Sequence, residues 1–413
     1  MPGCLPLAAS TRVGFDQAAA VLLEETATDP RKRRQTAGPF LPVSPPLFAG
    51  KHLVLAGLSE LIRLDPATLE VVSRDPGARL SNEGAAVLPD GRVACVTVGG
   101  DRLVTAEGQE LYAAPGRICS NIALSADGKP VVGVAPDLIQ VVGGPTCQVP
   151  RAAQQTPECD RALALATSRE RIVGLTRDGR VVAFGTDGCL SWCVQESMSW
   201  PRVPPIFSPD GATVYVSSVH GAVVALDARD GRERWRLALD PKDNYCVTPP
   251  ALDEHGNLHL YTQGSTILRI SPEGRLLHRI PTGTRYYVSM GYRAQLELDR
   301  LGNLVVTANP DETLVFAPEG HRRMRLATEE LFDGMGEFVD SFALSPERDR
   351  AIILSGSRGI AEVELPRTPG EVRDALRAAI ASREADGSGP RVGVRDGWVT
   401  VGSTRLRRRR LEA

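Results

Sequence analysis

Six polar side chains could supply oxygen ligands to a metal ion, because each stands just before a segment with the composition of a strand. They are Asn82, Glu83, Asn121, Asp160, Asn244 and Asp340. Carboxylate and amide oxygens are the ligands that calcium prefers, and a bound calcium ion could assist hydrolysis. Asn and Asp are equally common at such positions because their side chains hydrogen-bond within turns. A metal site is therefore an alternative interpretation, and we assign no metal ligand.

The histidines and cysteines form no recognisable metal or redox motif. His255 and His259 are four residues apart, but one lies in an expected turn and the other in the strand that follows it. The eight cysteines include no C-x-x-C pair, and Cys189 and Cys193 are four residues apart. Paired metal ligands usually stand closer together than this. We therefore expect reduced thiols and no cofactor.

Aromatic, methionine and arginine side chains gather in four segments of the second half of the chain. Four of the seven Tyr and three of the five Met fall there. These residue types are enriched at protein–protein interfaces, although they could equally fill gaps between structural units. The candidate partner-binding residues are Met198, Trp200, Arg202, Tyr245, Tyr286, Tyr287, Tyr292, Arg293, Phe332 and Phe338.

The composition excludes several classes of partner. The 413 residues carry a net charge of −2, which gives no attraction to nucleic acid or to a membrane surface. The chain contains no run of 18 apolar residues that could span a membrane. Its first residues have neither a basic region nor a continuous apolar region of the kind found in secretory signals. We therefore expect a cytoplasmic protein.

A repeat organises most of the sequence. Strand-like segments that precede a turn begin near residues 46, 86, 123, 163, 205, 250, 296 and 342. The best-preserved copy, residues 205–239, contains four short β-rich runs separated by turns such as Asp210-Gly211 and Asp230-Gly231. A period near 40 residues with four strands in each copy is typical of a β-propeller. The expected fold is all-β, with eight blades, or seven as the alternative.

One copy carries a spaced motif, A-x-D-x-x-x-G-x-E-x-W, formed by Ala225, Asp227, Gly231, Glu233 and Trp235. A degraded copy ends at Trp192. The motif resembles the tryptophan-docking repeat of quinoprotein-like (PQQ-like) propellers, and the resemblance covers roughly residues 45–365 as a fold. In that family the Trp packs between neighbouring blades, so the resemblance implies a structural role for these six residues.

The resemblance is closer to the non-catalytic members of that family than to the quinone dehydrogenases. The dehydrogenases carry adjacent cysteines that enclose the quinone, and this chain has no Cys-Cys pair. The resemblance therefore implies neither a quinone cofactor nor quinone-dependent oxidation.

We expect three segments: residues 1–40, a propeller over 41–366, and a C-terminal part over 367–413. The last repeat lacks its outer strand, which residues 12–25 or the C-terminal hairpin could supply. Thr368-Pro369-Gly370-Glu371 predicts the start of a helix, and residues 391–395 and 398–406 predict a β-hairpin. The basic runs at 31–34 and 407–410 are interpreted as a solvated linker and an exposed tail.

The sequence thus favours a non-enzymatic scaffold that presents one rim of a propeller to a partner protein. The alternative is a small-molecule-binding protein, or a metal-dependent lactonase-type hydrolase, with its site in the central channel.

Overall fold

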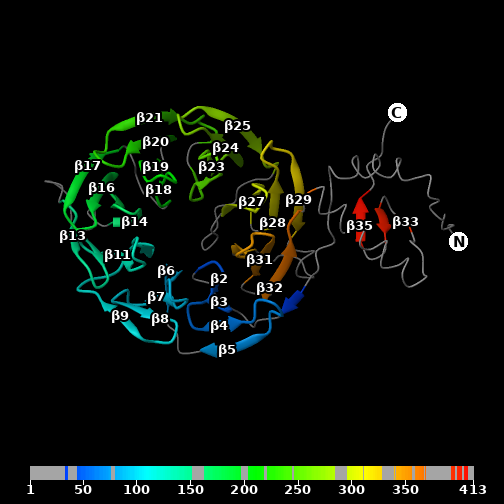
Figure 1. Cartoon of the computed structure of the whole chain (residues 1–413), viewed down its shortest axis with the longest axis horizontal. Coiled ribbons are helices and arrows are strands. Elements are labelled where there is room, and N and C mark those ends of the chain that lie inside the picture. Colours follow the sequence, from blue (N-terminus) through cyan, green and yellow to red (C-terminus); the bar gives the residue numbers. More distant parts are fainter. Residues whose placement is uncertain are drawn as a thin grey trace.

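Eight four-stranded antiparallel sheets form a closed ring in the computed structural model (Figure 1). The expected eight-bladed propeller is therefore confirmed. The structure describes residues 33–35, 44–75, 80–150, 162–196, 203–217, 221–243, 246–283, 295–309, 311–327, 339, 341–355, 359–366, 368, 392–395, 398–401 and 404–407.

Blades 1 to 4 follow one another along the chain, each with its strands in sequence order from the inside of the ring to the outside. Blade 1 contains β2 (Leu47–Ala49), β3 (His52–Ala56), β4 (Leu61–Leu64) and β5 (Val71–Asp75); blade 2 contains β6 (Leu80–Val87), β7 (Val93–Thr97), β8 (Arg102–Thr105) and β9 (Glu110–Ala113). Blade 3 contains β10 (Ala123–Leu124), β11 (Pro130–Val134), β12 (Leu138–Val141) and β13 (Thr146–Gln148); blade 4 contains β14 (Ala162–Thr167), β15 (Arg171–Thr176), β16 (Arg180–Gly185) and β17 (Leu190–Gln195).

Blades 5 to 7 repeat this order, and blade 8 differs in its outer strand. Blade 5 contains β18 (Ile206–Phe207), β19 (Thr213–Ser217), β20 (Ala222–Asp227) and β21 (Glu233–Ala238); blade 6 contains β22 (Ala251–Leu252), β23 (Leu258–Tyr261), β24 (Thr266–Ile270) and β25 (Leu276–Pro281). Blade 7 contains β26 (Leu296–Leu298), β27 (Leu304–Asn309), β28 (Glu312–Phe316) and β29 (Arg322–Ala327); blade 8 contains β30 (Ser341–Leu344), β31 (Arg350–Ser355), β32 (Gly359–Glu364) and, as its outer strand, β1 (Arg33–Gln35).

The N-terminal strand β1 closes the ring by pairing with β32. Arg34 lies opposite Ala361, and Gln35 lies opposite Ile360. The outer strand of the last blade therefore lies in the N-terminal segment, residues 1–40, which was one expected source of that strand. It is, however, neither residues 12–25 nor the C-terminal hairpin. It comes instead from part of the basic run that was interpreted as a solvated linker. Pairing with β1 covers the edge of β32 and joins the last blade to the other end of the chain.

Turn chemistry explains why each blade folds locally. Gly211 and Gly231 have φ values of 72° and 74°, a left-handed conformation that glycine adopts without steric cost. In the first of these turns Ser208 receives the N–H of Thr213 on its hydroxyl at 2.9 Å, and Asp210 receives the N–H of Ala212 at 3.0 Å. The turn residues therefore set the register of the strands on either side.

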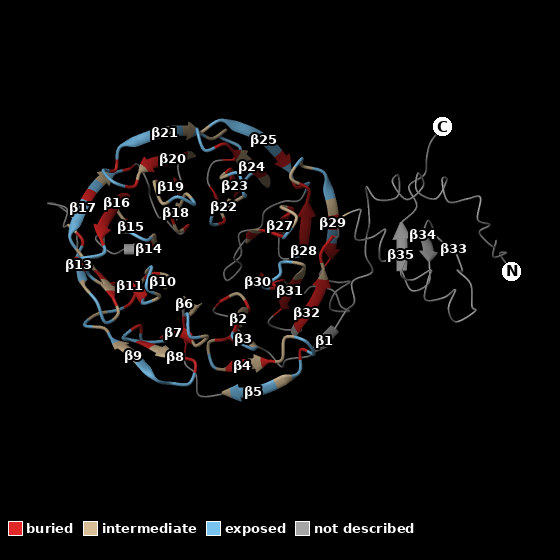
Figure 2. Ribbon diagram, in the orientation of Figure 1, coloured by how far each residue is buried: buried red, intermediate tan, exposed pale blue. Residues whose placement is uncertain are grey.

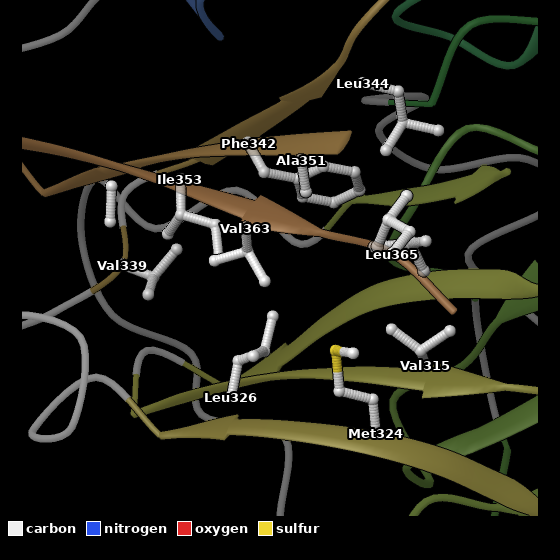
Figure 3. Packing of buried hydrophobic residues seen from close by; sticks show 12 residues of the cluster. Val315, Met324, Leu326, Val339, Phe342, Leu344, Ala351, Ile353, Val363 and Leu365 are labelled. Atoms are coloured by element: carbon white, nitrogen blue, oxygen red, sulfur yellow. The ribbon is translucent and has the colours of Figure 1, made fainter. Parts of the chain in front are cut away.

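The core consists of apolar layers between neighbouring blades. Figure 2 shows buried segments mainly on the middle strands of the blades and exposed segments along the outer strands of the ring. One layer joins blades 7 and 8: Met324 and Leu326 from β29 face Phe342, Ile353 and Val363 (Figure 3). An apolar layer of this kind lies in each of the eight seams, so every blade packs on both of its neighbours.

The C-terminal residues contain a three-stranded sheet rather than a hairpin. It consists of β33 (Val392–Arg395), β34 (Trp398–Val401) and β35 (Thr404–Arg407), and Figure 1 shows it outside the ring. The expected pairing around residues 396–397 is present, since Arg395 lies opposite Trp398. The expected second strand over 398–406 is divided in two, because Val401 turns back to pair with Thr404. The expected helix lies outside the described residues.

Candidate partner-binding face

All ten candidate partner-binding residues lie outside the described residues, but the strands that flank them are described. Each blade has four antiparallel strands, so it begins and ends on the same rim of the ring. We call this the connection rim, and the opposite one the turn rim. The segments that contain the ten residues join β17 to β18, β21 to β22, β25 to β26 and β29 to β30. They therefore all leave from, and return to, the connection rim.

The residues at which these four segments leave the outer strands are buried. Glu196, Asp243, Thr282 and Ala327 are at most 7% exposed. The Arg236 guanidinium contacts the Glu196 carboxylate at 2.8 Å, and Arg279 contacts Asp243. In both pairs the arginine belongs to the outer strand of the blade that follows the carboxylate. These pairs therefore join neighbouring blades at the base of the connecting segments.

Hydrogen bonds also fix the bases of these segments on the inner side. The Thr262 hydroxyl donates to Asp243 Oδ1 at 3.0 Å, and the Thr282 hydroxyl donates to the carbonyl of Ser265 at 3.0 Å. Gln295 receives the N–H of Phe342 on Oε1 at 2.7 Å, so the start of blade 7 is bonded to the start of blade 8. A rigid base of this kind is the usual support for binding loops.

The docking motif lies within the seams between blades 4, 5 and 6. Trp192 is 7% exposed, and its indole N–H donates to the carbonyl of Ala228 in blade 5 at 3.0 Å. The Trp235 indole N–H donates to the carbonyl of Pro272 in blade 6 at 2.7 Å. Each indole also lies against a glycine: a Cβ on Gly231 would be 2.7 Å from the Trp192 ring, and one on Gly274 would be 2.5 Å from the Trp235 ring.

The other motif residues shape the blade that carries Trp235. Ala225 is fully buried and lies opposite Trp235 in the ladder between β20 and β21. Asp227 caps the following turn by accepting the N–H of Arg229 at 2.9 Å, and it contacts Arg234 at 2.8 Å. Glu233 contacts Arg236 at 2.6 Å. Each of these side chains is engaged in packing, in a turn or in an ion pair. The motif therefore has a structural role.

Asn121 is the only candidate metal ligand whose side chain is described, and its amide is already engaged. Its Oδ1 accepts the N–H of Leu165 at 2.8 Å, and its Nδ2 donates to the carbonyl of Leu165 at 3.1 Å. Asn121 therefore joins blade 3 to the inner strand of blade 4. Asp160, Asn244 and Asp340 lie outside the described residues. The described part of the chain contains no group of three or more His, Cys, Asp or Glu placed to hold a metal ion.

His259 belongs to a buried polar network inside blade 6. Its Nε2 lies 3.2 Å from Asp253 Oδ2, and Arg269 and Asn257 also contact that carboxylate, each at 2.9 Å. Burial raises the pKa of Asp253, but hydrogen bonds from Asn257 and His259 outweigh it and bring the pKa to about 2. Burial lowers the pKa of His259, against the effect of Asp253. His255 is exposed in the preceding turn, so the two histidines do not converge.

Cys189 and Cys193 are free, exposed thiols on the outside of blade 4. A hydrogen bond to Asp187 raises the pKa of Cys189, and partial desolvation of its sulfur raises the pKa of Cys193, although the residue as a whole is exposed. Raised pKa values keep both thiols protonated at neutral pH, which is unfavourable for a nucleophile or a metal ligand.

Sequence reasoning missed the ion pairs at the base of the connecting segments. Arg236 and Arg279 occupy the same place in their outer strands, opposite Val224 and Leu268. An arginine that recurs at one position of the outer strand in five of the blades was the available signal. Among the described residues, no helix has the length and apolar character needed to cross a membrane.

Comparisons with solved structures agree on the fold. A computationally designed protein, Ika8, is similar with a TM-score of 0.60 and 14% identity, over 80% of this chain and 98% of that chain. Sqt1 of Saccharomyces cerevisiae is similar with a TM-score of 0.59 and 10% identity, over 81% of this chain and 98% of that chain. At these identities the likeness concerns the fold alone.

One curated relative matches locally. The serine/threonine-protein kinase AfsK of Streptomyces coelicolor is 41% identical over 61 residues, which are 14% of this chain and 7% of the kinase. The match thus spans a small part of that protein.

A family model described as outer membrane protein assembly factor BamB matches residues 57–244 and, in an overlapping placement, residues 177–316. The two placements together cover more than half of the chain, and they include both docking tryptophans. The chain therefore belongs to this family of non-catalytic, PQQ-like repeat propellers.

Proposed function

We propose that this protein is a non-enzymatic scaffold that binds a partner protein on its connection rim, over blades 4 to 8. The observation that carries the proposal is the buried, ion-paired base under the connecting segments that contain the aromatic residues. Glu196 with Arg236 and Asp243 with Arg279 hold that base in two successive seams. A fixed base lowers the entropy that a binding loop loses when it meets its partner.

The residue types in these segments suit a protein partner. Trp200, Tyr287 and Phe338 are large aromatic side chains from three different connections, and such side chains supply most of the free energy at protein interfaces. The family model is described as an assembly factor, and this description supports a role in binding other proteins. We do not carry kinase activity over from AfsK, because the match covers 7% of that protein.

The channel hydrolase gains no support from the described residues. Asn121 would have to leave its two hydrogen bonds to Leu165 in order to bind calcium. We therefore propose no metal-dependent reaction. A cytoplasmic location remains part of the proposal, and fractionation of cells that express the tagged full chain would test it.

The proposal predicts that binding depends on the connection rim. The full chain is used to capture its partner from the native host, and the captured protein is then purified and titrated against variants. The triple variant Trp200→Ala, Tyr287→Ala, Phe338→Ala should weaken binding at least about 100-fold, because aromatic anchors at interfaces often contribute more than ~1 kcal/mol each.

A matched triple variant on the turn rim serves as the control. Arg232, His255 and His321 are exposed there, in turns of blades 5, 6 and 7. Their replacement by Ala should leave the dissociation constant unchanged. If the turn-rim variant loses binding and the connection-rim variant keeps it, the proposed face is the wrong one.

A further inference from the structure

The outer strands of five consecutive blades carry an arginine at one shared register position. Each lies opposite the same residue of the third strand: in blades 5, 6 and 7 Arg236 faces Val224, Arg279 faces Leu268 and Arg325 faces Leu314. Arg34 in blade 8 faces Ala361, and Arg74 in blade 1 faces Ile62. The corresponding positions in blades 2, 3 and 4 hold Ala113, Gln148 and Cys193.

These arginines stand on sheet edges, where a charge has a defined physical effect. The outermost strand of each blade presents unpaired backbone groups to its surroundings, and another strand could pair with them. A charged side chain at the edge opposes such pairing. Arg74, Arg236 and Arg279 are each about two-fifths exposed and so remain at the surface.

An outer strand is protected either by a charged side chain or by being short. Among the eight outer strands that the structure describes, β17 has neither form of protection. β9 and β13 are four and three residues long, and so offer little to a pairing strand. β17 has six residues, Leu-Ser-Trp-Cys-Val-Gln, and none of them is charged. The other six-residue outer strands, β21, β25 and β29, all contain arginine. The edge of blade 4 is thus the long, neutral one.

The exposure along β17 shows which of its groups a second strand would meet. Leu190, Ser191, Cys193 and Gln195 are exposed, and Leu190 is 47% exposed, whereas Trp192 is buried in the seam with blade 5. The Glu196 N–H points inward, since it donates to the carbonyl of Gly179 at 2.9 Å. Backbone groups alternate in direction along a strand, so those of Gln195 and Cys193 point outward.

We propose that β17 pairs with β17 of a second copy of this chain, antiparallel and about a twofold axis at Cys193. In that register Cys193 lies opposite its own counterpart, Trp192 lies opposite Val194, and Ser191 lies opposite Gln195. No charge meets a like charge, and two blades join into one eight-stranded sheet. This assembly is independent of the partner proposed for the connection rim.

Self-complementarity is the reason for choosing a second copy as the occupant. A twofold contact places identical strands against each other, so a charged strand repels itself. The same pairing of β21 would put Arg236 opposite Arg236. β17 avoids this repulsion and supplies a partner strand of equal length. A contact of this size predicts a weak dimer that forms at high protein concentration.

The test measures the oligomeric state of the full chain by sedimentation velocity over a concentration series. The wild type should sediment as a monomer–dimer mixture that shifts toward dimer with concentration. Cys193→Arg introduces the residue type that five other blades carry at this position. It should raise the dimer dissociation constant at least about tenfold, because it sets two arginines opposite each other. Ala113→Arg places the same charge at the same register position of blade 2 and should leave the dimer unchanged.

A second variant and a crosslink keep the result independent of the folding of Cys193→Arg. Gln195→Pro removes an outward N–H and should also abolish the dimer. In a Cys189→Ser background, a short bismaleimide should join Cys193 to Cys193 at mildly alkaline pH, where part of the thiol is ionised, as read by mass spectrometry. A wild type that stays monomeric at every concentration overturns the proposal. The same monomeric result is expected if the edge of β17 pairs with a strand of another protein instead. A dimer that survives both β17 variants overturns it as well.

Discussion

Trp235 acts across a blade boundary, although its motif is continuous in the sequence. Ala225, Asp227 and Gly231 come from the same repeat as Trp235, yet the indole lies against Gly274 and Pro272 of the next blade. The sequence could predict that the Trp packs between blades, because the spacing of the motif resembles that of a known repeat. It could not predict which glycine receives which Trp, because that depends on how neighbouring blades pack.

Substitution of Gly274 by alanine tests this seam at the scale of a single residue. Gly274 has a φ of 83°, and an added Cβ would lie 2.5 Å from the Trp235 ring. The strained backbone and the overpacked ring should together lower the free energy of unfolding by ~2–4 kcal/mol. Equilibrium denaturation in urea measures this difference.

Gly143 provides the matched control for that substitution. Its φ is 67°, but no atom lies within 4 Å of an added Cβ. Gly143→Ala should therefore show the backbone cost alone, ~1 kcal/mol. Equal losses for the two variants would mean that contact with Trp235 contributes nothing.

At the scale of the element, β1 is where sequence reasoning fell short. Arg33–Gln35 has no alternating apolar pattern, and two of its three residues are basic. Such a segment becomes a strand only because β32 offers an unpaired edge. Tertiary pairing decides its structure, so local propensity gives no signal. The turn motifs of the other strands, in contrast, carry their information locally.

Deletion of residues 1–35 should destabilise the ring, because it removes β1 and leaves the edge of β32 open. We expect a lower melting temperature and faster aggregation on heating, followed by circular dichroism and light scattering. Deletion of residues 1–30 keeps β1 and should behave like the full chain. Identical melting curves for the two deletions would show that β1 does not close the ring.

At the scale of the whole molecule, the even number of strands in each blade decides on which rim the connecting segments lie. It puts every blade-to-blade connection on one rim, whatever the sequence of the connections. The repeat starts were sufficient to predict eight blades and this common rim. They could not predict the ion pairs below it, because Arg236 meets Glu196 across a separation of 40 residues.

The central claim is that the connection rim binds a protein, and hydrogen–deuterium exchange of the full chain with and without the captured partner tests it most directly. The account predicts slower exchange in residues 197–202, 244–245, 284–294 and 328–338 when the partner is bound. It predicts no change in the turn-rim segments 208–212, 253–257 and 317–321. Protection confined to the turn rim, or to the inner strands that line the channel, would contradict the account.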